Sequence, residues 1–154
     1  MFERFSGHLR TTVAGARSIA RLQGSPTIEA QHLLLAILDD PSARTARAIR
    51  RLGLSKEAVG DAIDRELAGA LGAVGVSLES FAPTRRVPGS SNPRWGQSAK
   101  LALERTLRAA SDRGDKRLDD RHLLLGLARA EAGVVPRLFE LLGLTPGSVA
   151  AALA

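Results

Sequence analysis

The three histidines are the residues of this sequence most suited to acid–base catalysis or metal binding, and their surroundings favour neither. His32 and His122 each precede an apolar run, and no Asp-His or His-x-x-x-His spacing supplies a second ligand. His8 has no evident partner, and the serines and aspartates show no nucleophile elbow or triad signature. We therefore predict no catalytic residue, no metal site and no cofactor. For His32 and His122 we predict a structural role at a helix start or in the core.

The composition narrows the class of protein further. Cysteine is absent, which excludes disulfides, thiolate chemistry and cysteine-based zinc sites. Aromatic residues make up only 3% of the chain, which disfavours a β-sandwich core and a stacking platform for bases. Alanine and leucine dominate the apolar residues and favour helices. We see no secretory signal and no apolar run near the ~20 residues that span a bilayer, so we expect a cytoplasmic protein without a membrane segment.

The strongest pattern is an internal duplication with a constant offset of ninety residues. His-Leu-Leu-Leu occurs at 32–35 and again at 122–125, and Leu-Gly-Leu occurs at 52–54 and at 142–144. Gly24 and Gly114, and Val59 and Val149, are separated by the same offset. Two similar halves that pack together form a quasi-symmetric groove, and we expect functional residues there.

Periodicity and capping residues predict four helices in each half and no strand of consequence. Proline, glycine and serine between the halves indicate a long linker. We predict an all-α fold of two tandem four-helix repeats, with repeat one at 1–67, the linker at 68–94 and repeat two at 95–154. The expected helices run from about 3 to 23, 29 to 38, 43 to 52, 55 to 67, 97 to 113, 119 to 129, 134 to 142 and 145 to the end.

These motifs resemble the Clp N-terminal domain, also known as the Clp repeat domain, of ClpC-type proteins. The opening Met-Phe-Glu-Arg-Phe, the two His-Leu-Leu-Leu runs and the two Leu-Gly-Leu motifs carry the resemblance. It implies a non-catalytic interaction module that receives substrate peptides or adaptor proteins and passes them to a Clp ATPase ring. No Gly-x-x-x-x-Gly-Lys-Ser/Thr loop is present, so we expect a domain that is free-standing or isolated from its AAA+ ATPase modules. We also expect a monomer.

The resemblance also implies a groove between the first helices of the two repeats, which binds peptides and small ligands. Arg10 and Lys100 are related by the ninety-residue offset, and so are Phe5 and Trp95. Two cations flanked by aromatic rings could hold an acidic or phosphorylated peptide. The alternative is that Arg10 and Lys100 are solvated while Phe5 and Trp95 pack in the core. The positions that match the groove are Phe2, Arg10, Val13, Trp95, Lys100, Leu103 and Glu104.

Some ClpC-type domains recognise phosphoarginine through a carboxylate just before the histidine of each His-Leu-Leu-Leu run. The matching positions here are Gln31 and Arg121, which depart from that pattern. Gln31 carries no charge, and Arg121 would repel a second guanidinium. The sequence therefore disfavours phosphoarginine binding, above all in the second repeat.

The alternative function is nucleic-acid binding. The formal net charge is +6, and the third helix carries a basic stripe of Arg44, Arg47, Arg50 and Arg51. The corresponding helix of the second half keeps only Arg137, and affinity for nucleic acid needs several clustered phosphate contacts. We therefore favour the interaction module.

Overall fold

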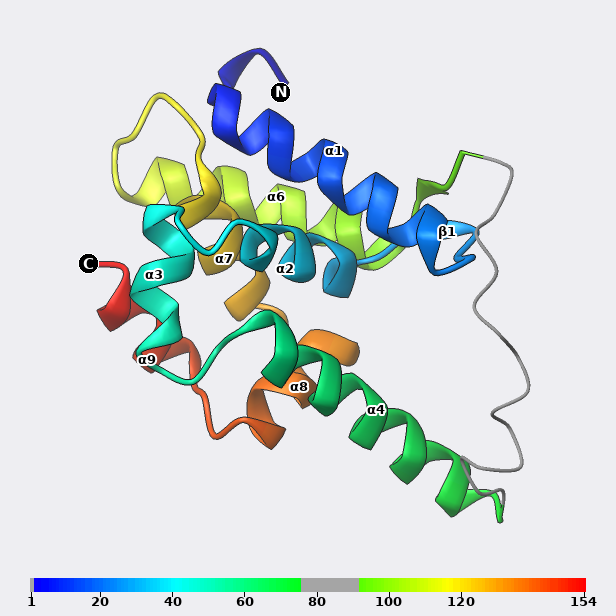
Figure 1. The fold of residues 1–154 in the computed structure, drawn as a ribbon. Helices are drawn as coiled ribbons and strands as arrows, with labels where there is room; N and C mark the ends of the chain where they lie inside the picture. Colours follow the sequence, from blue (N-terminus) through cyan, green and yellow to red (C-terminus); the bar gives the residue numbers. More distant parts are fainter. Residues whose placement is uncertain (1, 76–91) are drawn as a thin grey trace.

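The computed structural model describes residues 2–75 and 92–154, and helices dominate both ranges (Figure 1). The all-α prediction is confirmed. The first repeat contains η1 (Phe2–Arg4), α1 (Gly7–Leu22), α2 (Ala30–Asp39), α3 (Arg44–Arg50) and α4 (Lys56–Ala73). The second contains α6 (Gln97–Asp112), α7 (Asp120–Ala128), α8 (Val134–Leu141) and α9 (Pro146–Ala152).

Capping residues set several of the helix ends where the sequence predicted them. The Ser55 hydroxyl accepts a hydrogen bond from the Ala58 amide and caps α4. Thr145 caps α9, with proline in its first turn. Gly53 and Gly143 follow α3 and α8 with φ of 82° and 70°, a left-handed conformation that side chains other than glycine disfavour.

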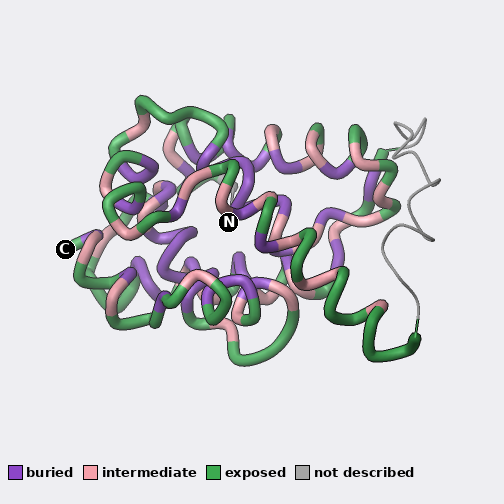
Figure 2. The backbone as a smooth tube through the Cα atoms, turned by 60° about the horizontal axis from the view of Figure 1, so that its bottom comes forward, coloured by how far each residue is buried: buried purple, intermediate pink, exposed green. Residues whose placement is uncertain are grey.

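The leucine-rich helices α2 and α7 form the centre of the fold. Figure 2 shows buried stretches of backbone inside the bundle, with exposed turns around them. Residues 32–38 of α2 and 122–128 of α7 are all buried. The two helices contact each other, α1 packs on α2, and α6 packs on α7. Burial on all sides explains why their sequences are apolar around the whole helix.

Two short backbone pairings join the repeats, and the ninety-residue offset relates them. β1 (Thr27–Ile28) pairs in parallel with β2 (Arg94–Trp95), which places Ile28 opposite Trp95. At the equivalent place, Leu118 forms a parallel bridge with Phe5. In each pairing, a residue just before the second helix of one repeat pairs with a residue just before the first helix of the other repeat. The sequence predicted no strand of consequence; these strands are short, but they connect the two repeats.

Two predicted boundaries are wrong. The first helix was expected from about Glu3, but the chain forms η1, extends at Phe5 to pair with Leu118, and starts α1 only after Ser6 caps it. The fourth helix continues to Ala73, past the expected end at Leu67, because good helix formers lie between its late glycines. Residues 76–91 of the predicted linker lie outside the described residues, and the division into two repeats and a linker stays a prediction.

Candidate functional site

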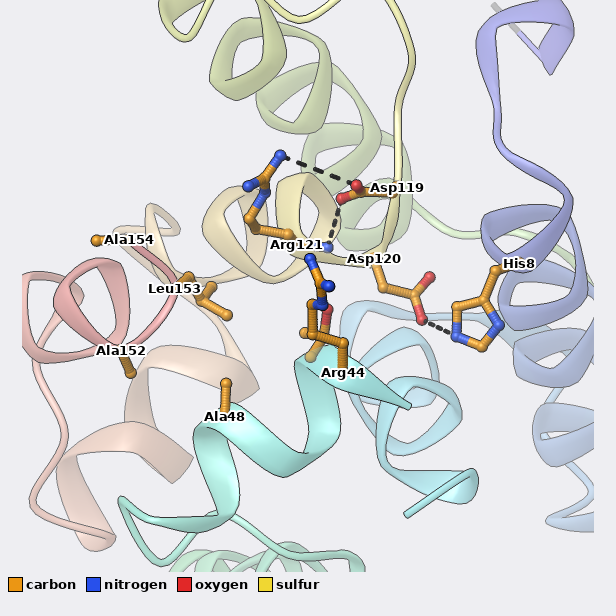
Figure 3. Close-up of a pocket in the computed structure, with 10 residues that line it drawn as sticks. His8, Arg44, Ala48, Asp119, Asp120, Arg121, Ala152, Leu153 and Ala154 are labelled. Atoms are coloured by element: carbon orange, nitrogen blue, oxygen red, sulfur yellow. Dashed lines mark hydrogen bonds and ion pairs between the residues drawn. The ribbon is translucent and has the colours of Figure 1, made fainter. Parts of the chain in front are cut away.

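Two pockets lie at the two junctions between the repeats. The first, here the α3 pocket, has a volume of about 410 Å³ and is shown in Figure 3. The second, here the α8 pocket, has a volume of about 620 Å³. Principal lining residues are His8, Arg44, Ala48, Asp120, Arg121 and Leu153 in the α3 pocket, and Gln31, Ser98, Leu101, Arg105, Val134 and Arg137 in the α8 pocket.

The ninety-residue offset relates the two pockets to each other. Each is built from the start of the second helix of one repeat and the starts of the first and third helices of the other. Arg121 in the α3 pocket therefore corresponds to Gln31 in the α8 pocket, and His8 corresponds to Ser98. The two positions that depart from the phosphoarginine pattern thus each line a pocket between the repeats.

A buried carboxylate, Asp120, lies at the wall of the α3 pocket. Its Oδ2 accepts a hydrogen bond from the Thr12 hydroxyl at 3.0 Å and lies 2.9 Å from Nε2 of His8. The expectation that His8 has no partner is therefore wrong, because α1 of the first repeat lies against α7 of the second. Burial raises the pKa of Asp120 above its ordinary value, although Thr12 and His8 favour the charged form.

The neighbouring Arg121 is held by acids of its own repeat. Its Nη2 lies 3.3 Å from the Asp115 carboxylate and 3.9 Å from that of Asp119. Asp119 caps α7 by accepting hydrogen bonds from the amides of Arg121 and His122. Hydrogen bonding from His122, together with the Arg121 charge, lowers the pKa of Asp115 despite partial desolvation.

The α8 pocket contains a hydrogen-bonded Glu29 and a larger apolar wall. Glu29 accepts hydrogen bonds from the hydroxyls of Ser98 and, at 2.7 Å, Thr27. Ser98 in turn accepts from the Ala30 amide at 2.9 Å, which ties α6 to the start of α2. Burial opposes ionisation of Glu29, but these hydrogen bonds and His32 outweigh it and lower its pKa. The pocket therefore combines fixed polar groups with apolar surface.

The histidines of the two His-Leu-Leu-Leu runs complete the starts of α2 and α7, as predicted. Nδ1 of His32 accepts a hydrogen bond from the Glu29 amide at 2.8 Å, and Nδ1 of His122 accepts from the Asp119 amide at 3.0 Å. The proton of each neutral ring is then on Nε2, which faces Gln23 for His32 and Asp115 for His122. Burial lowers the pKa of His32, partly offset by Glu29. Both rings therefore satisfy backbone amides at a helix start.

The predicted groove residues are placed as follows. Arg10, Lys100 and Glu104 are exposed on α1 and α6, whereas Val13 and Leu103 are buried in the core. None of these five residues lines either pocket. The Phe2 side chain lies outside the described residues.

The two predicted aromatic positions differ in burial. Phe5 is a core residue, only 1% exposed. Trp95 is half-buried against the core, with the Arg17 guanidinium 5.9 Å from its ring centroid.

Sequence reasoning did not find His8, Asp120, Glu29 and Ser98 as pocket residues. They come from different repeats, and only the packing brings them together. The equivalence of His8 with Ser98 under the offset was the one available signal. Among the described residues, no group of three or more histidines, aspartates or glutamates could hold a metal ion, and no helix is long and apolar enough to cross a membrane.

The sequence matches the model of the Clp repeat (R) N-terminal domain over residues 4–142. The chain belongs to this family. It is 26% identical over 149 residues to the chaperone protein ClpC1, chloroplastic, of Oryza sativa subsp. japonica, and it shares the same identity with ClpC1 of Arabidopsis thaliana. The match covers 97% of this chain but 15% of the rice protein.

Solved structures of Clp-type N-terminal domains share the fold. The N-terminal domain of ClpD from Arabidopsis thaliana matches with a TM-score of 0.68 and 18% identity, covering 99% of this chain and 96% of that domain. The N-terminal domain of Hsp104 from Candida albicans matches with a TM-score of 0.69 and 15% identity, covering 97% of this chain and 88% of that chain. At these identities the likeness establishes the fold.

Proposed function

We propose that this chain is a non-catalytic protein-interaction module of Clp-type protein quality control. It binds substrate peptides, adaptor proteins or small ligands between its two repeats, and a Clp ATPase ring is its partner. Membership of the Clp repeat family supports the setting. The pair of pockets at the two repeat junctions is the observation that supports binding there.

The size and lining of the pockets suit side chains of a polypeptide. Volumes of about 410 and 620 Å³ fall within the usual range of ligand pockets. The α8 pocket presents Leu101 and Val134 for apolar contact, with Gln31 and Arg105 as hydrogen-bonding groups. A peptide could insert one apolar side chain and be oriented by the polar groups at the wall.

The exposed residues of α1 and α6 form a second surface in this proposal. Arg10, Lys100 and Glu104 remain candidate contacts for an anionic ligand, whereas the buried Val13 and Leu103 act through packing. We do not expect phosphoarginine in the α3 pocket, since the Arg121 guanidinium would repel that of the ligand.

The test is fluorescence anisotropy with fluorescein-labelled casein as an unfolded substrate. Ala48→Phe fills the α3 pocket and Ala130→Phe fills the α8 pocket, since both alanines are partly exposed and line those pockets. Ala68→Phe on α4, which is exposed and outside both pockets, is the matched control. An Arg10→Ala/Lys100→Ala variant tests the second surface.

We expect each pocket-filling variant to weaken casein binding by about tenfold, the loss of roughly 1.4 kcal/mol of contact. The Ala68→Phe control should bind like the wild type, and all variants should melt cooperatively. Equal affinity for casein across the wild type, both pocket variants and the double alanine variant would refute binding between the repeats.

A further inference from the structure

The outward face of α3 carries arginines that lack acidic partners. Arg44, Arg47, Arg50 and Arg51 are all exposed. None forms an ion pair with another described residue, and α3 itself contains no acidic residue. By contrast, Arg137, Arg129 and Lys56 each pair with a carboxylate at 3.0 Å or less.

Helical periodicity places three of these arginines in one row. Thr45, Ala46 and Ile49 face inward and are buried. Arg44, Arg47 and Arg51, at spacings of three and four residues, therefore share the opposite face. The row begins at the α3 pocket, because Arg44 and Ala48 line it, and Figure 3 shows Arg44 extending from α3 toward α7, where Arg121 lies.

The acids that line the α3 pocket or precede α3 contact groups other than these arginines. Asp119 caps α7, and Asp120 is buried against Thr12 and His8. Asp40, which precedes α3, accepts hydrogen bonds from the amide and hydroxyl of Ser42. The positive charge of the row is thus left for a ligand outside the chain.

The equivalent surface of the second repeat does not carry a row of arginines. Under the ninety-residue offset, Val134, Arg137 and Leu141 of α8 replace Arg44, Arg47 and Arg51. The remaining cation, Arg137, contacts the Glu66 carboxylate at 2.5 Å. The equivalent face of α8 therefore has no cation without an acidic partner. The two repeats differ here in their side chains and not in their fold.

We propose that the α3 row and the α3 pocket together bind an acidic peptide segment. One carboxylate enters the pocket beside Arg44, and further acidic side chains follow the row to Arg47 and Arg51. This inference rests on the proposal that polypeptides bind at the repeat junctions, and it names their chemistry at one of the two. Binding at a single junction gives one acidic peptide per chain.

The spacing of the row sets the pattern of the peptide. Seven residues separate Arg44 from Arg51, which is roughly 10 Å along a helix at ~1.5 Å per residue. Three residues of a peptide in the polyproline II conformation span roughly the same length at ~3.1 Å per residue, and its three residues per turn bring every third side chain to the same face. A peptide with glutamate at every third position therefore matches the two ends of the row.

The experiment measures anisotropy of that fluorescein-labelled glutamate peptide, with glutamine and lysine versions of the same sequence alongside. The test variant is Arg44→Gln/Arg47→Gln/Arg51→Gln. The control is Arg21→Gln/Arg65→Gln/Arg108→Gln, which removes the same charge from exposed arginines elsewhere that also lack an ion-pair partner among the described residues. Unlabelled single-stranded DNA serves as competitor, and casein binding is measured in parallel.

We expect the test variant to lose about tenfold in affinity for the glutamate peptide while the control changes by less than about twofold. Equal losses in the two variants would overturn the site, since net charge alone would then explain binding. Tighter binding of the DNA, lost in the test variant, would overturn the peptide assignment in favour of nucleic acid. If casein binding still depends on the pockets after either of these results, the proposed function is retained and only the acidic-peptide site is refuted. The two proposals can therefore be tested separately.

Discussion

Two glycines inside helices should respond to alanine with opposite signs. Gly15 lies in α1 of the first repeat and Gly126 in α7 of the second. Exchange of glycine for alanine in a helix interior normally stabilises by up to ~1 kcal/mol, because alanine has the higher helix propensity. A Cβ on Gly15 would meet only the Ala36 Cβ at 3.7 Å, an ordinary contact. Gly15→Ala should therefore raise the free energy of unfolding by about 0.5–1 kcal/mol.

At Gly126 the added methyl has no room. Its Cβ would lie 2.8 Å from the Ala102 carbonyl oxygen, and at the same distance from the Thr106 amide nitrogen and hydroxyl. Two of these atoms belong to the α6 backbone, so α6 and α7 would have to separate. Overpacking of a tight core costs about 1–3 kcal/mol, and a backbone obstacle favours the upper part of that range. After the propensity gain, Gly126→Ala should lose about 1–2 kcal/mol.

Urea unfolding followed by far-ultraviolet circular dichroism measures both effects. The free energy of unfolding should rise for Gly15→Ala and fall for Gly126→Ala, with unchanged m-values. In thermal melts, Tm should fall by roughly 2–8 °C for Gly126→Ala. If Gly126→Ala is as stable as the wild type or more so, the close approach of α6 and α7 is wrong, and with it the geometry that places Asp120 beside the α3 pocket.

Two further predictions concern buried positions. Comparison with Asp120→Asn should reveal the raised pKa of Asp120. The folded chain binds the Asp120 proton more tightly than the unfolded chain, whose carboxyl has the ordinary pKa of 3.8. The protonated carboxyl therefore contributes its full stabilisation below pH 3.8, and this stabilisation is lost as pH rises through the raised pKa. The stability of the wild type relative to the variant should therefore fall as pH rises from about 4 toward neutrality in a series of urea titrations, and a difference that stays constant with pH would contradict the shift. Leu124→Asp should abolish cooperative thermal unfolding, because Leu124 is fully buried and an unpaired carboxylate there costs several kcal/mol. Leu141→Asp, at a position 42% exposed, should melt like the wild type, and a cooperative melt for Leu124→Asp would refute the core assignment.

Local signals in the sequence predicted most of the fold because they act over a few residues. Ser55 and Thr145 each cap a helix through their own hydroxyl, and Gly53 and Gly143 adopt the left-handed conformation at the predicted stops. The same locality explains the first missed boundary. Phe5 lies before α1 and pairs with Leu118, more than a hundred residues away in the sequence. No neighbouring residue indicates that pairing.

The candidate site was less predictable because its residues meet only across the repeats. His8 seemed to have no partner, since Asp120 comes from the other half of the chain. Arg10 and Lys100 were singled out by their shared offset, yet they line neither pocket. The offset identified equivalent positions correctly, but it could not say which of them face each other. That depends on the pseudo-symmetric exchange in which the start of each second helix meets the start of the other repeat's first helix.

This packing between the repeats also shows which residues differ between the two junctions. At one junction the long Glu29 side chain lies against Gly96, where a Cβ would come within 2.6 Å of three carboxyl atoms of Glu29. At the other, the shorter Asp119 takes the place of Glu29, and Ser6 takes the place of Gly96. The larger acid thus lies beside a glycine, and at the equivalent positions the sequence has a smaller acid and a serine.

The polar groups beside each acid also differ between the two junctions. Ser98 accepts a hydrogen bond from the backbone of Ala30, whereas its equivalent His8 contacts the carboxylate of Asp120, the equivalent of Ala30. At each junction, the residues that differ between the repeats contact residues of the other repeat. Residues at the two junctions can therefore differ while the leucine-rich core of α2 and α7 stays the same. The arginine row beside only one junction is a further difference of this kind.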